Sequence, residues 1–275
     1  MANAEHPCGG GVPPATYDHV IWIWMENHSA AQVIGQPGAP FVTGLAAACG
    51  QATNYRSVGS PSLPNYIGAT SGDTWGIGDD AGPGAHQLKV DNIFRQVRAS
   101  GRRAMSLQEA MPQRCASSSH ARYAVKHNPA AYYQGADDRS ACATDNAPLD
   151  LADDGAFQQA LAADTLPTFT FITPDLCNDT HDCPVSTGDQ WLANVVPLIL
   201  GSVAYRSGRT AVFLVWDEDS PMPFVPIAPN VTPGSRLTDR VDHYALLRTT
   251  EEMLGISTLL GKAAAAPSMR AAFNL

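Results

Sequence analysis

No run of apolar residues in this 275-residue sequence approaches the ~20 residues that a membrane-spanning helix needs. The longest run covers residues 19–25, so stable insertion into a membrane is not expected. Charge is also sparse, at 16% of residues, and 26 acidic side chains outnumber 17 basic ones. Because the net charge of −9 repels a phosphate backbone, nucleic acid is not an expected partner.

Two familiar cysteine and serine motifs are absent as well. No two cysteines stand at C-x-x-C spacing, which argues against a zinc finger or a thioredoxin-type redox site. The sequence contains no Gly-x-Ser-x-Gly, the turn that carries the nucleophile of α/β-hydrolases. A nucleophilic serine in this chain therefore needs a different setting.

The six cysteines that are present fit three disulfides in an oxidising compartment. Six thiols allow 15 pairings, and six reduced thiols in a cytosolic enzyme are the alternative. Our hypothesis is pairing in chain order: Cys8–Cys49, Cys115–Cys142 and Cys177–Cys183. The polar first five residues carry no signal peptide, so we expect a secreted protein whose export signal has been removed.

Hydrophobic residues make up 44% of the chain, enough for a sizeable core, and we expect a single domain over 1–275. Strands are predicted at 19–25, 166–173 and 210–216. Helices are predicted at 39–50, 66–71, 92–100, 187–202 and 244–254. The irregular parts are an arm over 1–16, loops over 59–65 and 220–234, and a loop-rich insertion over 110–150. This alternation predicts an α/β fold, a three-layer sandwich with a mostly parallel central sheet.

Oxygen-bearing side chains follow two of the predicted strands at once. Glu26 and Asn27 follow the first strand, and Asp217 and Glu218 follow the strand over 210–216. In a parallel sheet these ends share one edge, where ligands gather in open α/β folds. Crowded carboxylates need a cation, and oxygen ligands suit calcium, magnesium or manganese. Ordinary solvated strand ends are the alternative.

Ser62 is the candidate nucleophile. It stands between Pro61 and Pro64, which stiffen the turn, and a helix is expected to follow. A serine hydroxyl is a weak nucleophile until a base or a metal lowers its pKa. An ordinary Ser-Pro loop explains the local sequence equally well.

Two histidines are candidates for phosphate binding or proton transfer. His181 lies in the polar stretch over 175–183, which a Cys177–Cys183 disulfide would close. It could hold a phosphate or protonate a leaving group. His127 follows Lys126 within the insertion, where both could meet phosphate oxygens, and an exposed polar turn is the alternative. His243 is expected to be a packed histidine after a capping Asp242.

Five short segments, in this order, carry a family resemblance: MENHS at 25–29, PSLPNY at 61–66, DTHD at 179–182, WDE at 216–218 and DHY at 242–244. They resemble the phosphoesterase family of bacterial secreted acid phosphatases and phospholipases C, within the alkaline phosphatase superfamily. The likeness runs from about residue 18 to residue 256. It is greatest to actinobacterial secreted acid phosphatases that act on phosphoinositides.

The resemblance implies a role for each matching residue and an alkaline phosphatase-like fold. The implied metal ligands are Glu26, Asn27, Ser62, Asp217 and Glu218, with Ser62 also the nucleophile. His181 is implied to hold the phosphoryl group or assist the leaving group, and His127 to be a further partner. Two-zinc relatives carry Asp-His where this chain has Asp217-Glu218. We therefore expect one divalent cation, with calcium, magnesium or manganese ahead of zinc.

The expected function is that of a secreted, metal-dependent phosphomonoesterase, an acid phosphatase that acts through a phosphoserine. Its partners would be small phosphate esters, among them phosphoinositides, or phospholipid head groups. A phospholipase C-type phosphodiesterase is the enzymatic alternative, and a secreted calcium-binding module is the non-enzymatic one. If His181 must be protonated, activity should peak at mildly acidic pH.

Overall fold

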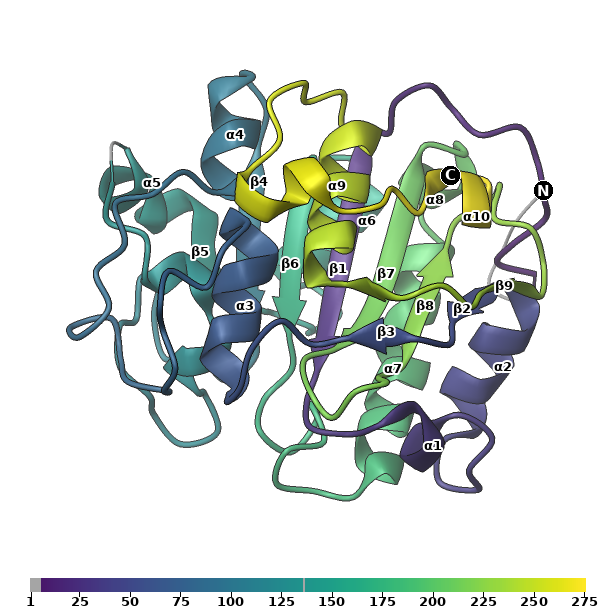
Figure 1. The fold of residues 1–275 in the computed structure, drawn as a ribbon, viewed down its shortest axis with the longest axis horizontal. Helices are drawn as coiled ribbons and strands as arrows, with labels where there is room; N and C mark the ends of the chain where they lie inside the picture. Colours follow the sequence, from purple (N-terminus) through teal and green to yellow (C-terminus); the bar gives the residue numbers. More distant parts are fainter. Residues whose placement is uncertain (1–5, 136) are drawn as a thin grey trace.

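The computed structural model describes residues 6–135 and 137–275 of the chain. Its main sheet has six strands in the order β5-β4-β6-β1-β7-β8, all parallel except β8 (Figure 1). From one edge to the other they are β5 (Asn146–Pro148), β4 (Ala104–Gln108), β6 (Phe169–Thr173), β1 (His19–Met25), β7 (Thr210–Trp216) and β8 (Phe224–Ile227). The carboxyl ends of the parallel strands therefore meet at one edge.

The centre of the sheet explains the apolar character of its strands. β1 pairs on one side with β6 and on the other with β7, where Ile21 is in register with Thr170 and Val212. Every residue of β6 and β7 is buried, and so is every residue of β1 after His19. Strands that helices cover on both faces read as continuous hydrophobic runs, as these do.

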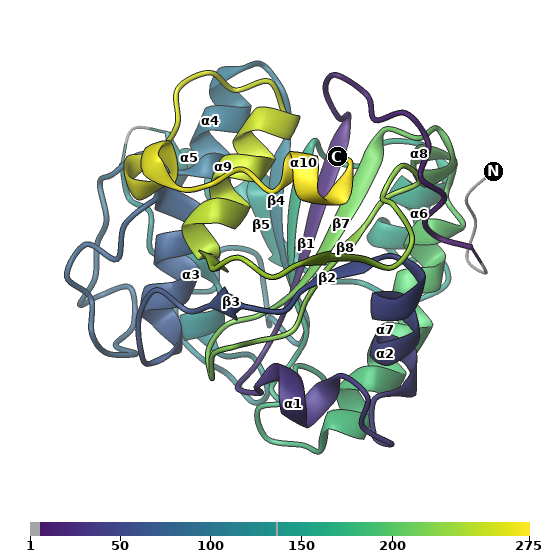
Figure 2. The ribbon, with the colours of Figure 1, turned by 45° about the vertical axis from the view of Figure 1, so that its right-hand side comes forward.

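Helices cover both faces of the sheet (Figure 2). One layer contains α3 (Ser62–Ser71), α4 (Ile93–Ala99) and α9 (His243–Met253), and the other contains α6 (Ala156–Ala162), α7 (Val185–Leu200) and α8 (Val203–Arg206). The remaining helices are α1 (Ala30–Val33), α2 (Pro40–Ala48), α5 (Asp138–Asp145), α10 (Arg270–Phe273), η1 (Val125–His127), η2 (Pro129–Ala131) and η3 (Gly261–Ala265). The predicted three-layer α/β architecture is confirmed. Among the described residues, no helix has the length and apolarity to cross a bilayer.

Two short strand pairs form separate two-stranded sheets beside the main sheet. β2 (Gly50–Ala52) pairs with β9 (Ser235–Leu237), and β3 (Tyr55–Arg56) pairs with β10 (Val241–Asp242). These pairs connect the segment before α3 to the segment before α9. They therefore help to place two helices of the same layer.

The three predicted strands are present, but several irregular regions were misjudged. Helix α3 begins at Ser62, so the predicted loop over 59–65 is wrong in its second half. The proline-rich stretch over 220–234 contains the buried strand β8, and the insertion over 110–150 supplies the edge strand β5. Short strands that contain proline, as both of these do, look like loops in sequence, and neighbouring strands decide their conformation.

The three disulfides join the cysteines in chain order, as the hypothesis stated: Cys8–Cys49, Cys115–Cys142 and Cys177–Cys183. The first fastens the irregular N-terminal arm to the residue that follows α2. The second lies within the 110–150 insertion, and the third closes a loop after β6. The first five residues of the predicted arm lie outside the described residues.

A glycine in α7 allows the loop closed by Cys177–Cys183 to pack against the helix. A Cβ atom on Gly188 would lie 2.3 Å from the Cγ2 of Thr180 and 2.8 Å from the carbonyl oxygen of Asn178. Since a helix interior normally disfavours glycine, close packing explains this residue. Gly44, in α2, has no atom within 4 Å of the same position.

We expect Gly188→Ala to lower the free energy of unfolding by about 1–3 kcal/mol, because the added methyl group overpacks the contact with the loop. Gly44→Ala is the matched control and should raise stability by up to about 1 kcal/mol through helix propensity. Urea denaturation of both variants measures the difference. Equal effects of the two substitutions would contradict the packing argument.

Candidate active site

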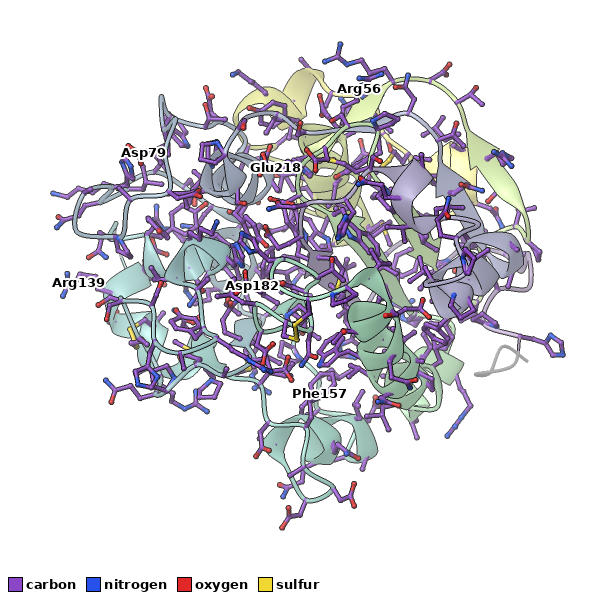
Figure 3. The ribbon with its side chains drawn as sticks, turned by 90° about the horizontal axis from the view of Figure 1, so that it is seen from below. Arg56, Asp79, Arg139, Phe157, Asp182 and Glu218 are labelled. Atoms are coloured by element: carbon purple, nitrogen blue, oxygen red, sulfur yellow. A yellow bond between two sulfur atoms is a disulfide. The ribbon has the colours of Figure 1, made fainter. Side chains whose placement is uncertain are left out.

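The predicted site residues gather at the carboxyl edge of the sheet. Glu26 and Asn27 follow β1, while Asp217 and Glu218 follow β7, its direct neighbour. Figure 3 looks onto this edge, where Glu218 lies toward the middle of the molecule and Asp182 lies in the loop after β6. Residues far apart in the sequence are thus brought together by parallel strand pairing.

The Glu26 carboxylate contacts Ser62 through one oxygen and Tyr66 through the other. Ser62 Oγ donates to Glu26 Oε2 at 3.0 Å, and Tyr66 Oη donates a short hydrogen bond to Glu26 Oε1. All three side chains are buried, Glu26 with an exposed fraction of 0%. A buried carboxylate is stable only with such partners, so these contacts fix its orientation.

Helical spacing explains why Ser62 and Tyr66 reach the same carboxylate. Ser62 is the first residue of α3, and residues four apart on a helix share one face. The sequence pattern predicts a loop at Ser62 and indicates no role for Tyr66, whereas the structure places both residues in α3. Extending the helix back to Ser62 would have revealed the pair, because the two residues then lie one turn apart.

His127 lies behind Glu26, between two acidic side chains. Its Nε2 is 3.3 Å from Glu26 Oε2 and its Nδ1 is 3.2 Å from Asp179 Oδ2. Its ring stacks on that of Tyr66, with centroids 5.3 Å apart. Both ring nitrogens face carboxylates, so the direct phosphate contact predicted from the sequence does not match this geometry. The contacts suit a residue that positions Glu26.

The ion pairs of His127 with Glu26 and Asp179 shift the pKa values of these buried side chains. Burial by itself would lower the pKa of His127, but the charges of Glu26 and Asp179 raise it to about 10. Burial would also raise the pKa of Glu26, yet the His127 charge and the Tyr66 hydrogen bond hold it below its ordinary value. Burial raises the pKa of Asp179. At neutral pH, His127 is therefore a cation beside an ionised Glu26.

Asn27 contacts the acidic pair Asp217 and Glu218, which follows β7. The backbone N–H of Asn27 donates to Asp217 Oδ1 at 3.1 Å. One terminal atom of the Asn27 amide is 3.1 Å from Glu26 Oε2, 3.3 Å from Asp217 Oδ1 and 3.2 Å from Glu218 Oε1. With the amide nitrogen there, its two N–H groups can donate to two of the three; with the oxygen there, four oxygens converge and need a cation.

This donor set fits a hard divalent cation. Asp217 is fully buried, its Oδ2 has no hydrogen-bond partner, and burial raises its pKa well above the ordinary value. Burial followed by the charge of Glu26 also raises the pKa of Glu218. A bound cation would compensate these carboxylates. Within the described residues, no three His, Cys, Asp or Glu side chains form a metal-binding cluster by themselves, so Asn27 and Ser62 are needed to complete the set.

His181 lies at the outer side of the same site. Its side chain is 28% exposed and its Nδ1 is 2.7 Å from Asp182 Oδ1, while its backbone N–H donates to Asp179 Oδ1 at 2.8 Å. The ring centroid is 5.8 Å from that of His127. Of the two candidate histidines, His181 is thus the one with access to solvent.

His243 braces the acidic pair Asp217 and Glu218 from the side of α9. Its Nε2 is 2.7 Å from the carbonyl oxygen of Asp217, and Tyr55 Oη is 2.8 Å from its Nδ1. Burial lowers the pKa of His243 to about 4, so a neutral ring donates to Asp217 and accepts from Tyr55. The expectation of a packed histidine after a capping Asp242 is confirmed.

Three residues around the site hold a left-handed backbone conformation: Asn27 (φ 48°), Thr180 (φ 79°) and Asp219 (φ 70°). Each follows a different one of the three central strands. Such conformations cost free energy for residues other than glycine, most of all for β-branched Thr180. Their clustering at one sheet edge is typical of a functional site.

Comparison with known proteins finds phosphatases among the relatives of this chain. The chain is 28% identical to a phosphatidylinositol-3-phosphatase of Mycobacterium tuberculosis, over 88% of this chain and 78% of that protein. It is 27% identical to a phosphate-repressible acid phosphatase of Penicillium chrysogenum and to an acid phosphatase of Aspergillus fumigatus, over 74% and 76% of this chain. It spans about half the length of these fungal proteins, 48% and 46%.

Solved structures show the fold. A protein of the alkaline phosphatase superfamily from Vibrio parahaemolyticus superposes with a TM-score of 0.64 at 12% identity, over 93% of this chain and 71% of that one. The lipoteichoic acid synthase LtaP of Listeria monocytogenes gives 0.61 at 12% identity, over 90% and 75%. The profile of the Phosphoesterase family matches residues 36–232, and this chain belongs to that family.

Proposed function

We propose that this protein is a metal-dependent phosphomonoesterase that uses Ser62 as nucleophile and passes through a phosphoserine. As a member of the Phosphoesterase family the chain is a phosphoric ester hydrolase, which does not support the calcium-binding module without activity. The observation that carries the proposal is the contact of Ser62 Oγ with Glu26 Oε2. It places a hydroxyl group at the start of a helix, beside the converging oxygens of Asn27, Asp217 and Glu218.

The residues that would hold a divalent cation are Glu26, Asn27, Ser62, Asp217 and Glu218. When bound, such an ion lowers the pKa of a serine hydroxyl and offsets charge on phosphoryl oxygens. The oxygen ligands favour calcium, magnesium or manganese over zinc.

In the proposed mechanism, Glu26 orients the Ser62 hydroxyl and accepts its proton, and Oγ attacks phosphorus in line with the leaving alcohol. His181 donates a proton to the alcohol oxygen as the P–O bond breaks, and Asp182 holds its ring. Water then attacks the phosphoserine and gives a proton to His181, and Glu26 returns its proton to Ser62 Oγ as the Oγ–P bond breaks and inorganic phosphate is released. The helix start at Ser62 contributes partial positive charge near the phosphoryl group.

We also propose that the natural substrates are small phosphate esters, including phosphoinositides, in an extracellular setting. The relative from Mycobacterium tuberculosis is named for such a lipid, and the three disulfides suit an oxidising compartment.

Ser62→Ala should reduce kcat for 4-nitrophenyl phosphate by at least about 1000-fold, because among the described residues Ser62 has the one aliphatic hydroxyl that donates to the Glu26 carboxylate. Glu26 keeps Tyr66 as a partner, so the melting temperature should change little. The matched control is Ser207→Ala, whose hydroxyl donates to Ala204 near the opposite edge of the sheet. Retained turnover in the Ser62 variant would refute the nucleophile assignment.

Removal of divalent cations with EDTA should lower activity more than about tenfold, and calcium, magnesium or manganese should restore it. Added ion should also raise the melting temperature of the wild-type protein but not of Asp217→Asn. Asp153→Asn, which changes an exposed aspartate, is the control. Full activity after exhaustive chelation would rule out the metal.

His181→Ala should lower kcat/KM for phenyl phosphate about 100-fold, and for 4-nitrophenyl phosphate about tenfold, because nitrophenolate leaves without much help from an acid. His86→Ala is the matched control, since Nε2 of His86 is 2.6 Å from Asp79 in a similar exposed pair. Equal losses with both substrates would show that His181 is not the general acid.

A further inference from the structure

Asp80 connects the start of α3 to Lys126. Its Oδ1 accepts a hydrogen bond from the backbone N–H of Leu63 at 2.9 Å, and its Oδ2 accepts one from Lys126 Nζ at 3.0 Å. Leu63 directly follows Ser62 in the chain. One carboxylate therefore holds a lysine next to the first turn of the helix that presents the nucleophile.

The backbone of Lys126 is also held in place, by the contacts of its neighbour His127. Lys126 precedes His127 in η1, and the His127 ring lies between Glu26 and Asp179. The lysine side chain is 21% exposed, so it is neither buried in the core nor free on the surface. An ammonium group has three donors, and the hydrogen bond to Asp80 uses one of them.

The side chains around Ser62 include more acidic groups than basic groups that could bind a phosphate monoester. Glu26, Asp217 and Glu218 repel a dianion, and His127 already faces two carboxylates. The first turn of α3 offers few free donors, because Leu63 N–H binds Asp80 and Pro64 has no N–H. A bound divalent ion compensates the carboxylates only in part.

The charge of Lys126 interacts with the carboxylates of Glu26 and Asp217. Burial would lower the pKa of Lys126, but the hydrogen bond to Asp80 and the charges of Glu26 and Asp217 raise it above its ordinary value. The ammonium is therefore charged over the whole working range of an acid phosphatase.

We propose that Lys126 binds a non-bridging oxygen of the substrate phosphoryl group and makes the site selective for monoesters, with Asp80 as its positioning residue. This inference rests on the proposed function. A monoester has three non-bridging oxygens and carries two charges, whereas a diester has two such oxygens and one charge. In a diester the second ester group would take the place of the oxygen that Lys126 binds.

The test compares Lys126→Met with Lys126→Arg, and uses Lys262→Met as the matched control. Lys262 also pairs with an aspartate, with its Nζ 2.9 Å from Asp73 Oδ1, but Asp73 lies just beyond the opposite end of α3. Rates are measured with 4-nitrophenyl phosphate and bis(4-nitrophenyl) phosphate. Inorganic phosphate serves as competitive inhibitor.

Lys126→Met should lower kcat/KM for the monoester about 10- to 100-fold, which is the worth of one hydrogen bond to a charged group. The inhibition constant of inorganic phosphate should rise by a similar factor, while kcat/KM for the diester changes less than threefold. Lys126→Arg should recover most of the loss, because it restores the charge. Lys262→Met should behave as the wild-type protein does.

Equal losses for monoester and diester, or an unchanged inhibition constant for phosphate, would overturn the proposal and leave Lys126 as a brace for α3. That result differs from failure of the proposed function itself. In that case the wild-type protein would not turn over the monoester, or Ser62→Ala would remain active.

Discussion

The Glu26 carboxylate is the group on which the rest of the site depends. It directly follows the central strand β1 and is fully buried, where an unpaired charge would cost several kcal/mol. Ser62 and Tyr66 approach it from the same face of α3, and His127 approaches it from the 110–150 insertion. The position of the Ser62 hydroxyl is therefore set by the requirement to satisfy one acidic side chain.

The loop closed by Cys177–Cys183 reinforces that arrangement at the level of the backbone. Glu26 N–H donates to the carbonyl oxygen of Asp179, and Thr180 Oγ1 donates to the carbonyl oxygen of Glu26. Gly188 lets α7 approach this loop closely. The strained conformation of Thr180 is thus held by a disulfide, two hydrogen bonds and close packing, a combination that keeps His181 at the open side of the site.

Charge complementarity gives the site its chemical character. The carboxylates of Glu26, Asp217 and Glu218 would repel a phosphate group unless a cation were bound. Two cationic side chains lie near these carboxylates, and they differ in their partners. His127 is committed to Glu26 and Asp179, whereas Lys126 is held at the rim by Asp80. A protein of the alkaline phosphatase superfamily shares this fold at 12% identity, so the sheet by itself does not determine the substrate.

The sequence by itself determined the central strands of the sheet and the oxygen-bearing pairs that follow two of them, because hydrophobic runs and their polar boundaries are local signals. The six cysteines that form the disulfides could also be read from the sequence. Edge strands such as β8, the helical start at Ser62 and the roles of Tyr66 and Asp80 were decided by tertiary structure. Tyr66 and Asp80 depend on partners distant in the chain, Glu26 and Lys126 respectively, and β8 depends on its pairing with the preceding strand β7. Local patterns cannot show which buried charge a side chain will meet, since only the packed fold brings the two together.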